Sequence, residues 1–474
     1  MKSTYTVKPA ITSVSPVPTQ LHQTLINIID SSIHNQAPYL CHSDILQTPG
    51  FSGRPGRARR LQIMNVELLS PAGSFEAMQA AINAGANAIY FGVEQLNMRS
   101  RSAGGFTVED IGEVSQRCHN AGLRCYITLN TVMYEYDMQL MQTILNAVKA
   151  AGVDAVIASD FAVIESCIRM GISVHISTQA NVSNLESVQF YARFADTIVL
   201  ARELTLKQIA HICNEIKRKQ VTGPSGRLVK IEVFIHGALC MAVSGKCYIS
   251  LHSQNASANR GACLQNCRRK YTVTDAETGE ALEVDNEYIM SPQDLCTINI
   301  LDEIVQTGVA ILKIEGRSKG ADYVHTVTAC YREAITSIHE GTYKADKIEN
   351  WMQRLSSVYN RGFWEGYYLG RQMGQWTRQP DSIATEKKVY AGKGTRFYPK
   401  IQVGEFLIET GTLQQGDILL LTGNAFGMQK ITFDHVLVNG EKQNKATRGD
   451  KITFPFPHKI TSSDKLYKLV ATNA

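Results

Sequence analysis

"VELLSPAGSFEAMQAAINAGANAIYFG", residues 66–92, contains a short apolar run, an amphipathic segment and a second apolar run. In the middle part, "FEAMQAAINAGA", apolar residues recur at spacings of three and four, which predicts a helix that covers a sheet. The two flanking runs predict buried strands. The stretch therefore indicates a strand, helix and second strand of a parallel sheet.

The same rhythm continues along the chain. Eight apolar runs, most of them separated by amphipathic segments, span residues 66–73, 88–92, 124–130, 155–160, 174–180, 197–203, 231–237 and 310–316. Eight strand and helix units predict an α/β fold, a closed (β/α)8 barrel of the triosephosphate isomerase type.

The composition outside this pattern divides the chain into four segments. Residues 1–63 are rich in Ser, Thr, Gln and Pro and predict a disordered N-terminal extension. Residues 64–340 carry the barrel pattern, and residues 341–384 predict a helical connector. Short alternating runs with glycine turns over residues 385–474 predict a small antiparallel β-barrel domain.

Composition and charge limit the function. The 474 residues are 44% hydrophobic and 19% charged, which predicts packed domains, and the net charge of +5 is compatible with a polyanionic partner but is not histone-like. No apolar run approaches the ~18 residues needed to span a bilayer, and the start lacks a secretion signal. We therefore expect a cytoplasmic protein.

Polar residues close most of the eight apolar runs. Active sites in such barrels lie at the C-terminal ends of the strands, so these residues predict one polar mouth. For any single one, a helix cap or turn residue is an equally good interpretation. They are Ser70, Asn130, Ser159, Asp160, Thr178, Gln179, Arg202, Glu203, His236, Glu315 and Arg317.

Two charged residues fall inside predicted strands. Glu67 lies in the first run and Lys313 in the eighth, and the first and last strands of a closed barrel are neighbours. Because burying either charge alone is costly, we expect an ion pair between them near the barrel top, in a structural or a functional role.

Four cysteines fall on the longest connection, between the seventh and eighth strands. Cys240, Cys247, Cys263 and Cys267 have the spacing C-x6-C-x15-C-x3-C. Eleven cysteines in a chain without a secretion signal argue against a disulfide framework. The spacing favours an iron–sulfur cluster over structural zinc, which commonly uses two tight pairs, and unliganded thiols are a third interpretation.

The rest of this connection predicts a hairpin over residues 271–284 and then a helix with Ser291 as its N-cap. Cys296 falls inside that predicted helix, so a core role fits it better than the role of substitute ligand.

Basic residues stand beside the cysteines and in the tail. Arg268, Arg269 and Lys270 follow Cys267 at once. In the tail, cations and aromatic residues interleave, which suits single-stranded nucleic acid, although a solvated strand edge explains the tail group equally well. The tail group is Lys387, Lys388, Tyr390, Lys393, Arg396, Phe397, Tyr398 and Lys400.

A resemblance covers about residues 65–370. The residues that match it are Glu232, Phe234, Gly237, Ala238, Leu239, Cys240, Gly245, Cys247, Ile249 and Ser250, with the segments "LLSPAG" (68–73), "STQA" (177–180), "LARELTL" (200–206), "NRGACLQNCRRKY" (259–271) and "KIEGR" (313–317). On these motifs the chain resembles the collagenase-like peptidase family U32.

Within this family, the chain is most similar to the prephenate-dependent tRNA uridine hydroxylases. The resemblance implies conversion of the wobble uridine of the tRNA anticodon loop to 5-hydroxyuridine. It also implies a 4Fe-4S cluster on Cys240, Cys247, Cys263 and Cys267, with Cys296 as the rival to Cys267 for the fourth position. Hydroxylation of a ribosomal RNA cytidine, as in a sister branch, is an alternative.

The two carboxylates of prephenate call for cationic side chains. Arg202 and Arg317 are the candidates, with His236 able to exchange a proton nearby and Glu315 completing the candidate catalytic set. The triplet Arg268, Arg269 and Lys270 is the candidate RNA-binding group.

Two other function classes stay open. A thiol peptidase could use His236 with Cys240, four residues later, if that segment is helical, although the chain has neither an HExxH nor a GxSxG motif. A metal-dependent peptidase is the other form of this class, and the lack of an HExxH motif in this chain argues against it as well. A non-catalytic, cluster-binding partner protein is the third class.

Overall fold

The structure is a computed structural model, which describes residues 66–100, 105–272, 274, 276–279, 290–370, 374–378, 381–434 and 436–472. The predicted N-terminal extension, residues 1–63, lies outside the described residues. Much of the predicted hairpin at residues 271–284 also lies outside them.

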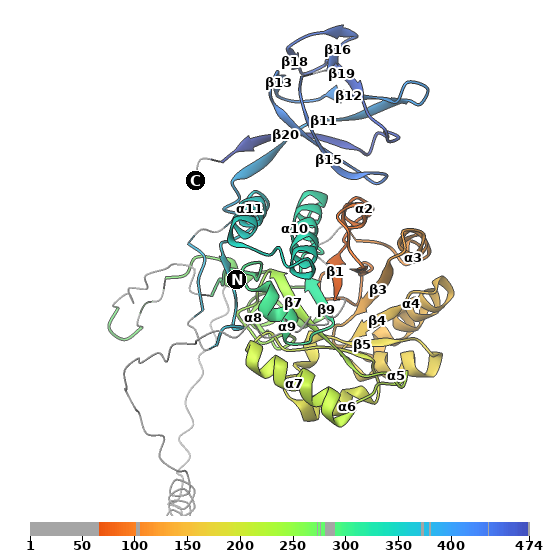
Figure 1. The fold of residues 1–474 in the computed structure, drawn as a ribbon, viewed down its shortest axis with the longest axis vertical. Coiled ribbons are helices and arrows are strands. Elements are labelled where there is room, and N and C mark those ends of the chain that lie inside the picture. Colours follow the sequence, from red (N-terminus) through yellow and green to blue (C-terminus); the bar gives the residue numbers. More distant parts are fainter. Residues whose placement is uncertain are drawn as a thin grey trace, which may run out of the picture. The chain divides into compact units, whose positions relative to one another are not determined.

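Eight parallel strands form the centre of the fold, and each overlaps one of the eight apolar runs (Figure 1). They are β1 (Glu67–Pro71), β2 (Ala88–Phe91), β3 (Arg124–Leu129), β4 (Ala155–Ala158), β5 (Val174–Ile176), β6 (Thr197–Val199), β7 (Lys230–Gly237) and β9 (Ile311–Ile314). Strand β9 pairs in parallel with both β1 and β7, which closes the sheet into a barrel. The predicted barrel of the triosephosphate isomerase type is confirmed.

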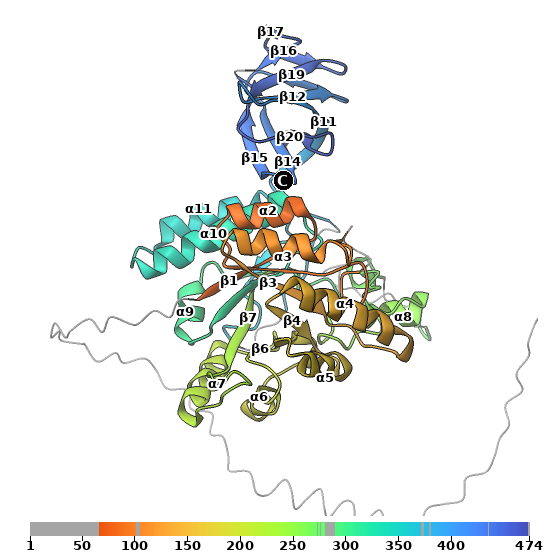
Figure 2. The ribbon, with the colours of Figure 1, turned by 90° about the vertical axis from the view of Figure 1, so that its right-hand side faces the viewer.

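Helices connect the strands and surround the barrel, as the two views in Figures 1 and 2 show. They are α2 (Phe75–Asn83), α3 (Ile111–Asn120), α4 (Met138–Ala151), α5 (Phe161–Met170), α6 (Leu185–Ala192), α7 (Leu206–Lys219), α9 (Leu301–Gln306) and α10 (Ala321–His339). Their apolar faces pack on the outward-facing side chains of the strands and form the main hydrophobic core.

The interior of the barrel is partly polar. Side chains at alternate strand positions point inward, and apolar ones such as Leu69, Tyr126 and Ile157 form a small separate cluster there. Buried charges lie among them. The Nζ atom of Lys313 donates a hydrogen bond to Oε1 of Glu232 at 2.7 Å, and both side chains are at most 5% exposed.

The predicted ion pair between Glu67 and Lys313 is wrong, although the strands that carry them do pair. The register places Ile311 beside Glu67 and Leu69 beside Lys313, so the two charges lie at different heights. Glu67 instead accepts hydrogen bonds from Arg124 and from the Tyr126 hydroxyl, the latter at 2.7 Å. Glu67 therefore finds its partners on β3, and Lys313 finds its partner on the neighbouring strand β7.

The connection between β7 and β9 differs from its predicted form. Ser291 does not start a helix, because the segment forms strand β8 (Asp294–Cys296), which pairs antiparallel with the end of β7. Strand β10 (Phe363–Trp364) adds to β8 in parallel. Residues 240–267, which carry the four cysteines, are called the cysteine segment, and helix α8 (Ile249–Gln254) lies within it. Helix α11 (Ala345–Ser356) follows α10.

The C-terminal part is an antiparallel β domain with its own core of Phe406, Phe454 and other buried residues. Eight of its strands pair in the order β15-β14-β20-β11-β12-β19-β16-β17, and β13 pairs with β18. The strands are β11 (Glu386–Tyr398), β12 (Val403–Ile408), β13 (Thr412–Gln414), β14 (Ile418–Gly423), β15 (Gly427–Thr432), β16 (Leu437–Val438), β17 (Glu441–Lys442), β18 (Lys445–Thr447), β19 (Lys451–Pro455) and β20 (Lys465–Ala471).

The buried pair in the barrel gives a stability prediction. Lys313→Met leaves the Glu232 carboxylate buried without its partner, so we expect the free energy of unfolding to fall by about 3–5 kcal/mol. The double variant Glu232→Leu with Lys313→Met should recover most of that loss. Urea unfolding followed by circular dichroism measures both.

The control is Arg354→Met, which breaks the half-exposed pair between Arg354 and Glu333 and should cost about 0–1 kcal/mol. If Lys313→Met were no more destabilising than Arg354→Met, the buried pair would not hold the barrel interior together.

Candidate functional site

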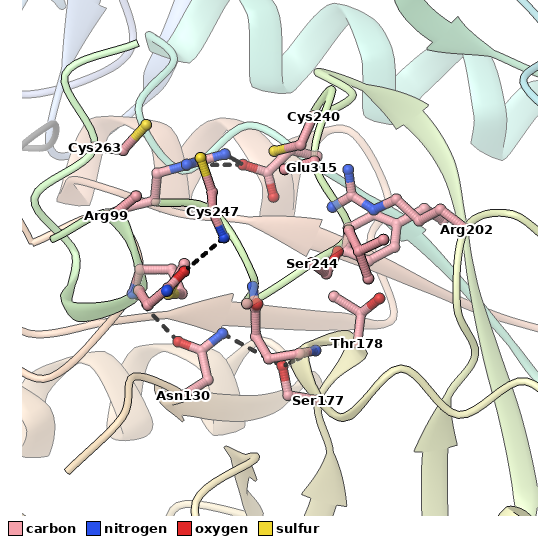
Figure 3. A pocket seen from close by; sticks show the side chains of 18 of the residues that line it. Arg99, Asn130, Ser177, Thr178, Arg202, Cys240, Ser244, Cys247, Cys263 and Glu315 are labelled. Atoms are coloured by element: carbon pink, nitrogen blue, oxygen red, sulfur yellow. Dashed lines mark hydrogen bonds and ion pairs between the residues drawn. The ribbon is translucent and has the colours of Figure 1, made fainter. Parts of the chain in front are cut away.

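A cavity of about 960 Å³, open solvent included, lies at the C-terminal ends of the barrel strands. We call it the mouth cavity. Its floor is formed by the inward side chains Tyr90, Thr128, Ile157, Phe234 and Lys313. Loops that follow the strands provide the walls, and the cysteine segment after β7 closes one side (Figure 3). The site therefore lies where the barrel fold predicts it.

A single cation lies at the floor. The Nζ atom of Lys313 is 4.5 Å from the centre of the Tyr90 ring, which adds a cation–π contact to its bond with Glu232. Below it, Nδ1 of His175 lies 3.9 Å from Oε2 of Glu232. Burial, with help from Lys313, lowers the pKa of His175 to about 3, so this imidazole is neutral at physiological pH.

Three arginines surround one carboxylate in the wall. Oε1 of Glu315 accepts hydrogen bonds from Nη2 and Nε of Arg99, at 2.9 and 3.1 Å. Burial alone would raise the pKa of Glu315, but Arg99, Arg202 and Arg317 outweigh it and lower that pKa to about 2. The wall therefore presents a surplus of positive charge to the cavity.

Arg202 and Arg317 are both brought to the cavity, as predicted, and both are held by their own chain. Nη1 of Arg202 donates to the Ala238 carbonyl at 2.9 Å, and its guanidinium carbon lies 4.0 Å from the centre of the Phe234 ring. Nη1 of Arg317 donates to Thr128 Oγ1 at 2.6 Å. A side chain at Gly92 would collide with Arg317, so glycine is required there.

Unsatisfied polar atoms remain among these wall residues. In the part of the chain that the structure describes, the buried Nε atoms of Arg202 and Arg317 and the buried Oε1 atom of Gln179 have no hydrogen-bond partner. Buried donors and acceptors are nearly always paired. The pattern indicates a bound polar molecule, with acceptors for the arginines, or ordered water.

The four predicted cysteines all line the mouth cavity. Figure 3 shows the sulfurs of Cys240, Cys247 and Cys263 at the end of the cavity where Arg99 lies. None of the four is fully buried, whereas the other described cysteines all are: Cys118, Cys125, Cys167, Cys213, Cys296 and Cys330. Burial raises the pKa of the Cys267 thiol, and the three neighbouring cysteines add to that rise while Arg268 opposes it.

Hydrogen bonds hold the cysteine segment over the cavity. The Cys247 N–H donates to Asn259 Oδ1 at 3.2 Å, and the Asn259 carbonyl accepts from the Val132 N–H at the end of β3. Asn181 Nδ2 donates to the Ser244 carbonyl at 2.8 Å. These anchors come from different strand ends, so the position of the thiols depends on closure of the barrel.

His236 is not brought to the mouth cavity, although it ends strand β7. Phe234 pairs with Lys313, but His236 pairs with Ile314, so Ile235 forms a bulge that shifts the inward and outward alternation. The ring lies 2% exposed behind the barrel wall, with Nδ1 3.3 Å from the Tyr331 hydroxyl. Burial lowers its pKa to about 4, and no hydrogen bond in the described residues links it to a cavity cysteine.

Cys296 also lies apart from the four thiols. It sits on β8 with 3% exposure, and its sulfur is 3.9 Å from the Tyr331 hydroxyl. The residue lies in a strand and not in the predicted helix, and its side chain belongs to the main hydrophobic core. This position fits the core role and not that of a rival ligand.

The basic triplet divides into two parts. Arg268 is largely buried and donates to the Ser291 hydroxyl at 2.9 Å and to the Pro292 carbonyl at 2.6 Å. It therefore holds the cysteine segment against the chain before β8, and its role in RNA binding stays a prediction. Arg269 and Lys270 are exposed.

Several other predicted residues have local structural roles. The hydroxyl of Ser70 is 2.8 Å from that of Thr328, and Asp160 caps α5 by accepting from the Ala162 N–H. In the tail group, Lys393 pairs with Glu409 at 2.8 Å. The cap interpretation holds for Asp160. The strand-edge interpretation is wrong for Lys393, because β11 pairs with β12 on one side and with β20 on the other.

Arg99 is a charged residue of the cavity that the sequence pattern does not predict. It lies on the loop after β2, several residues beyond the end of that strand, in the sequence "NMRSR" (97–101). The two arginines of this sequence, Arg99 and Arg101, were the signal that could have indicated a cationic site there.

The charge of Glu315 gives a prediction about pH. Because its pKa in the folded chain is lowered from 4.5 to about 2, its contribution to stability is complete above about pH 4.5 and is lost as the pH falls towards 2. The difference in free energy of unfolding between the wild type and Glu315→Gln should therefore be constant from pH 8 to about 5 and shrink below that. Urea unfolding at each pH measures it, with Glu349→Gln, on an exposed helix face, as the control. A difference that grew on acidification would contradict the ion-pair geometry.

Comparisons with known proteins extend this description. A family model described as Peptidase family U32 matches residues 73–378. A protein named collagenase from Porphyromonas gingivalis is 47% identical over 408 residues, which cover 86% of this chain and 99% of the relative.

Within the described residues, no helix is both long and apolar enough to cross a membrane.

Two further relatives are named for RNA modification. A tRNA hydroxylation protein of Bacillus subtilis is 35% identical over 319 residues, covering 66% of this chain and 73% of that protein. A 23S rRNA 5-hydroxycytidine synthase of Escherichia coli is 37% identical over 276 residues, covering 58% of this chain and 40% of that protein. By the extent of the family match and of the first relative, this chain belongs to peptidase family U32.

Proposed function

We propose that this chain is an RNA-modifying enzyme that hydroxylates the wobble uridine of tRNA to 5-hydroxyuridine, with prephenate as co-substrate and an iron–sulfur cluster in the mouth cavity. The observation that carries the proposal is the combination of four thiols and three arginines on one cavity at the end of the barrel. Relatives named for tRNA and rRNA hydroxylation support the same reaction class.

The donor set supports the cluster. In the described residues, no three of the cavity thiols have sulfurs within 4.8 Å of one another. Four sulfurs at 2.3 Å from one zinc ion would lie roughly 3.8 Å apart. The wider spacing favours a larger group, and Cys240, Cys247, Cys263 and Cys267 would hold it. A 4Fe-4S cluster, when bound, supplies one-electron chemistry.

The cations of the cavity support a dicarboxylate co-substrate. Arg202 and Arg317 each keep a buried Nε donor without a partner, and a carboxylate is a strong acceptor for an arginine. Because Glu315 is already ionised and engaged with Arg99, it would orient that arginine and would not accept a proton at neutral pH. Lys313 on the floor would place a third positive charge below the bound molecule.

The rim supports a single-stranded RNA partner. Arg269 and Lys270 are exposed next to Cys267, where they can meet phosphates. Tyr134 and Tyr136 are 47% and 73% exposed, and Arg260 lies 4.0 Å above the Tyr134 ring. Exposed aromatic rings suit base stacking, and an anticodon loop already presents unstacked bases.

Peptidase activity is the second candidate, because the relative with 47% identity is named collagenase. A thiol peptidase needs a base within reach of its nucleophile. His236 does not provide one for Cys240, since the bulge in β7 places its ring in the core. The proposed cluster would also occupy the same thiol.

The cluster is tested on a protein that begins at residue 64 and is purified in the absence of oxygen. We expect a broad absorbance near about 400 nm and about four iron and four sulfide per chain, as a 4Fe-4S cluster requires. Cys240→Ala and Cys263→Ala should abolish both, whereas the control Cys296→Ala should keep them. A colourless wild type, or loss of iron in Cys296→Ala alone, would contradict the proposed ligands.

The reaction is tested in cells that lack their own RNA hydroxylases. Expression of the wild type should produce 5-hydroxyuridine in digested tRNA, measured by mass spectrometry, only when the cells can make prephenate. Arg317→Met should lower the product strongly while leaving the iron content unchanged. Product in ribosomal RNA instead of tRNA, or cleavage of a collagen peptide with no hydroxylated nucleoside, would replace the proposal with one of its alternatives.

A further inference from the structure

A second group of metal-ligating side chains lies at the other end of the barrel from the mouth cavity. His119 is in the last turn of α3, Cys125 is near the start of β3, and Asp154 directly precedes β4. One ligand atom from each of these residues lies within 4.8 Å of the others. Strand starts form the N-terminal end of a barrel, so this group is separate from the proposed active site.

Hydrogen bonds preorganise the group. Nε2 of His119 is 2.9 Å from Oδ2 of Asp154, and the Cys125 N–H donates to the same oxygen at 2.8 Å. The Cys125 thiol points to the Ser115 hydroxyl, 3.6 Å away. The hydrogen bond from the Cys125 N–H holds the Asp154 carboxylate beside Cys125, and the side chains of His119 and Asp154 are 41% and 31% exposed.

A second thiol completes the set. Cys118 precedes His119 on α3, is fully buried, and lies within hydrogen-bonding reach of Cys125. Two sulfurs, an imidazole nitrogen and a carboxylate oxygen are the ligand types that tetrahedral zinc sites use. Around zinc these atoms would lie roughly 3.3–3.8 Å apart. The atoms of His119, Cys125 and Asp154 already lie within 4.8 Å of one another, and the Cys118 thiol, which is outside that group, would turn toward them.

We propose that Cys118, His119, Cys125 and Asp154 form a binding site for a divalent transition-metal cation of the zinc class. Binding exchanges the thiol protons, which pass to solvent, for bonds to the metal. The ion joins the end of α3 to the starts of β3 and β4. At this end of the barrel its role is structural, and the partly exposed His119 provides the side from which the ion enters.

The test uses the full chain with all four cavity thiols removed by Cys240→Ser, Cys247→Ser, Cys263→Ser and Cys267→Ser, so that these thiols cannot take up zinc. Titration with Zn²⁺ alone, in competition with a coloured chelator, should show one bound zinc per chain. His119→Ala should weaken the affinity by about tenfold or more. Because His119 is exposed, its replacement leaves the packing of the core intact. The control His211→Ala, on the exposed face of α7, should bind like the parent.

Cobalt provides an independent readout. Co²⁺ bound to the parent should give a thiolate-to-cobalt charge-transfer band, reduced in Cys118→Ser and absent when Cys125→Ser is added. At one zinc concentration, zinc should also raise the melting temperature of the parent more than that of His119→Ala. Equal zinc affinity in the parent and His119→Ala, or a cobalt complex without a thiolate band, would overturn the site.

Discussion

Closure of the barrel through β9 is the constraint on which the site depends. Strand β9 lies between β1 and β7 and carries Lys313, and the chain that leaves it carries Glu315 and Arg317. Gly237 packs so closely against the backbone of Glu315 that a Cβ atom at this position would collide with it. Gly237 also adopts a positive φ of +105°, which favours glycine. The end of β7, and with it the start of the cysteine segment, is therefore placed by the same strand that supplies Lys313 and leads to Arg317.

This arrangement combines two chemically different halves in one cavity. One half is a set of four partly exposed thiols, and the other is a wall of arginines around the ionised carboxylate of Glu315. Burial makes such a surplus of positive charge costly unless anions complete it. Thiolates and a bound dicarboxylate would each do so, which is why cluster and co-substrate belong to one proposal. The relatives named for RNA hydroxylation fit this chemistry, although a relative named collagenase has the higher identity.

The sequence predicted the barrel and most of the site, because hydrophobic periodicity and strand-end polarity are local signals. It failed where the outcome depends on register. The bulge at Ile235 turns His236 away from the cavity, and the β1–β9 register separates Glu67 from Lys313. Neither is visible in a residue pattern. Arg268 shows a further limit, because a sequence pattern does not reveal that a basic residue beside a candidate site donates hydrogen bonds within its own chain. Arg99 was missed because its loop has no period.

Anomalous diffraction at the iron absorption edge, on crystals grown without oxygen, tests the central claim most directly. We predict a multi-iron peak bonded to the sulfurs of Cys240, Cys247, Cys263 and Cys267 and facing the arginine wall of the mouth cavity. A single zinc ion on these thiols, four free thiols, or a peak bonded to Cys296 in place of Cys267 would contradict it.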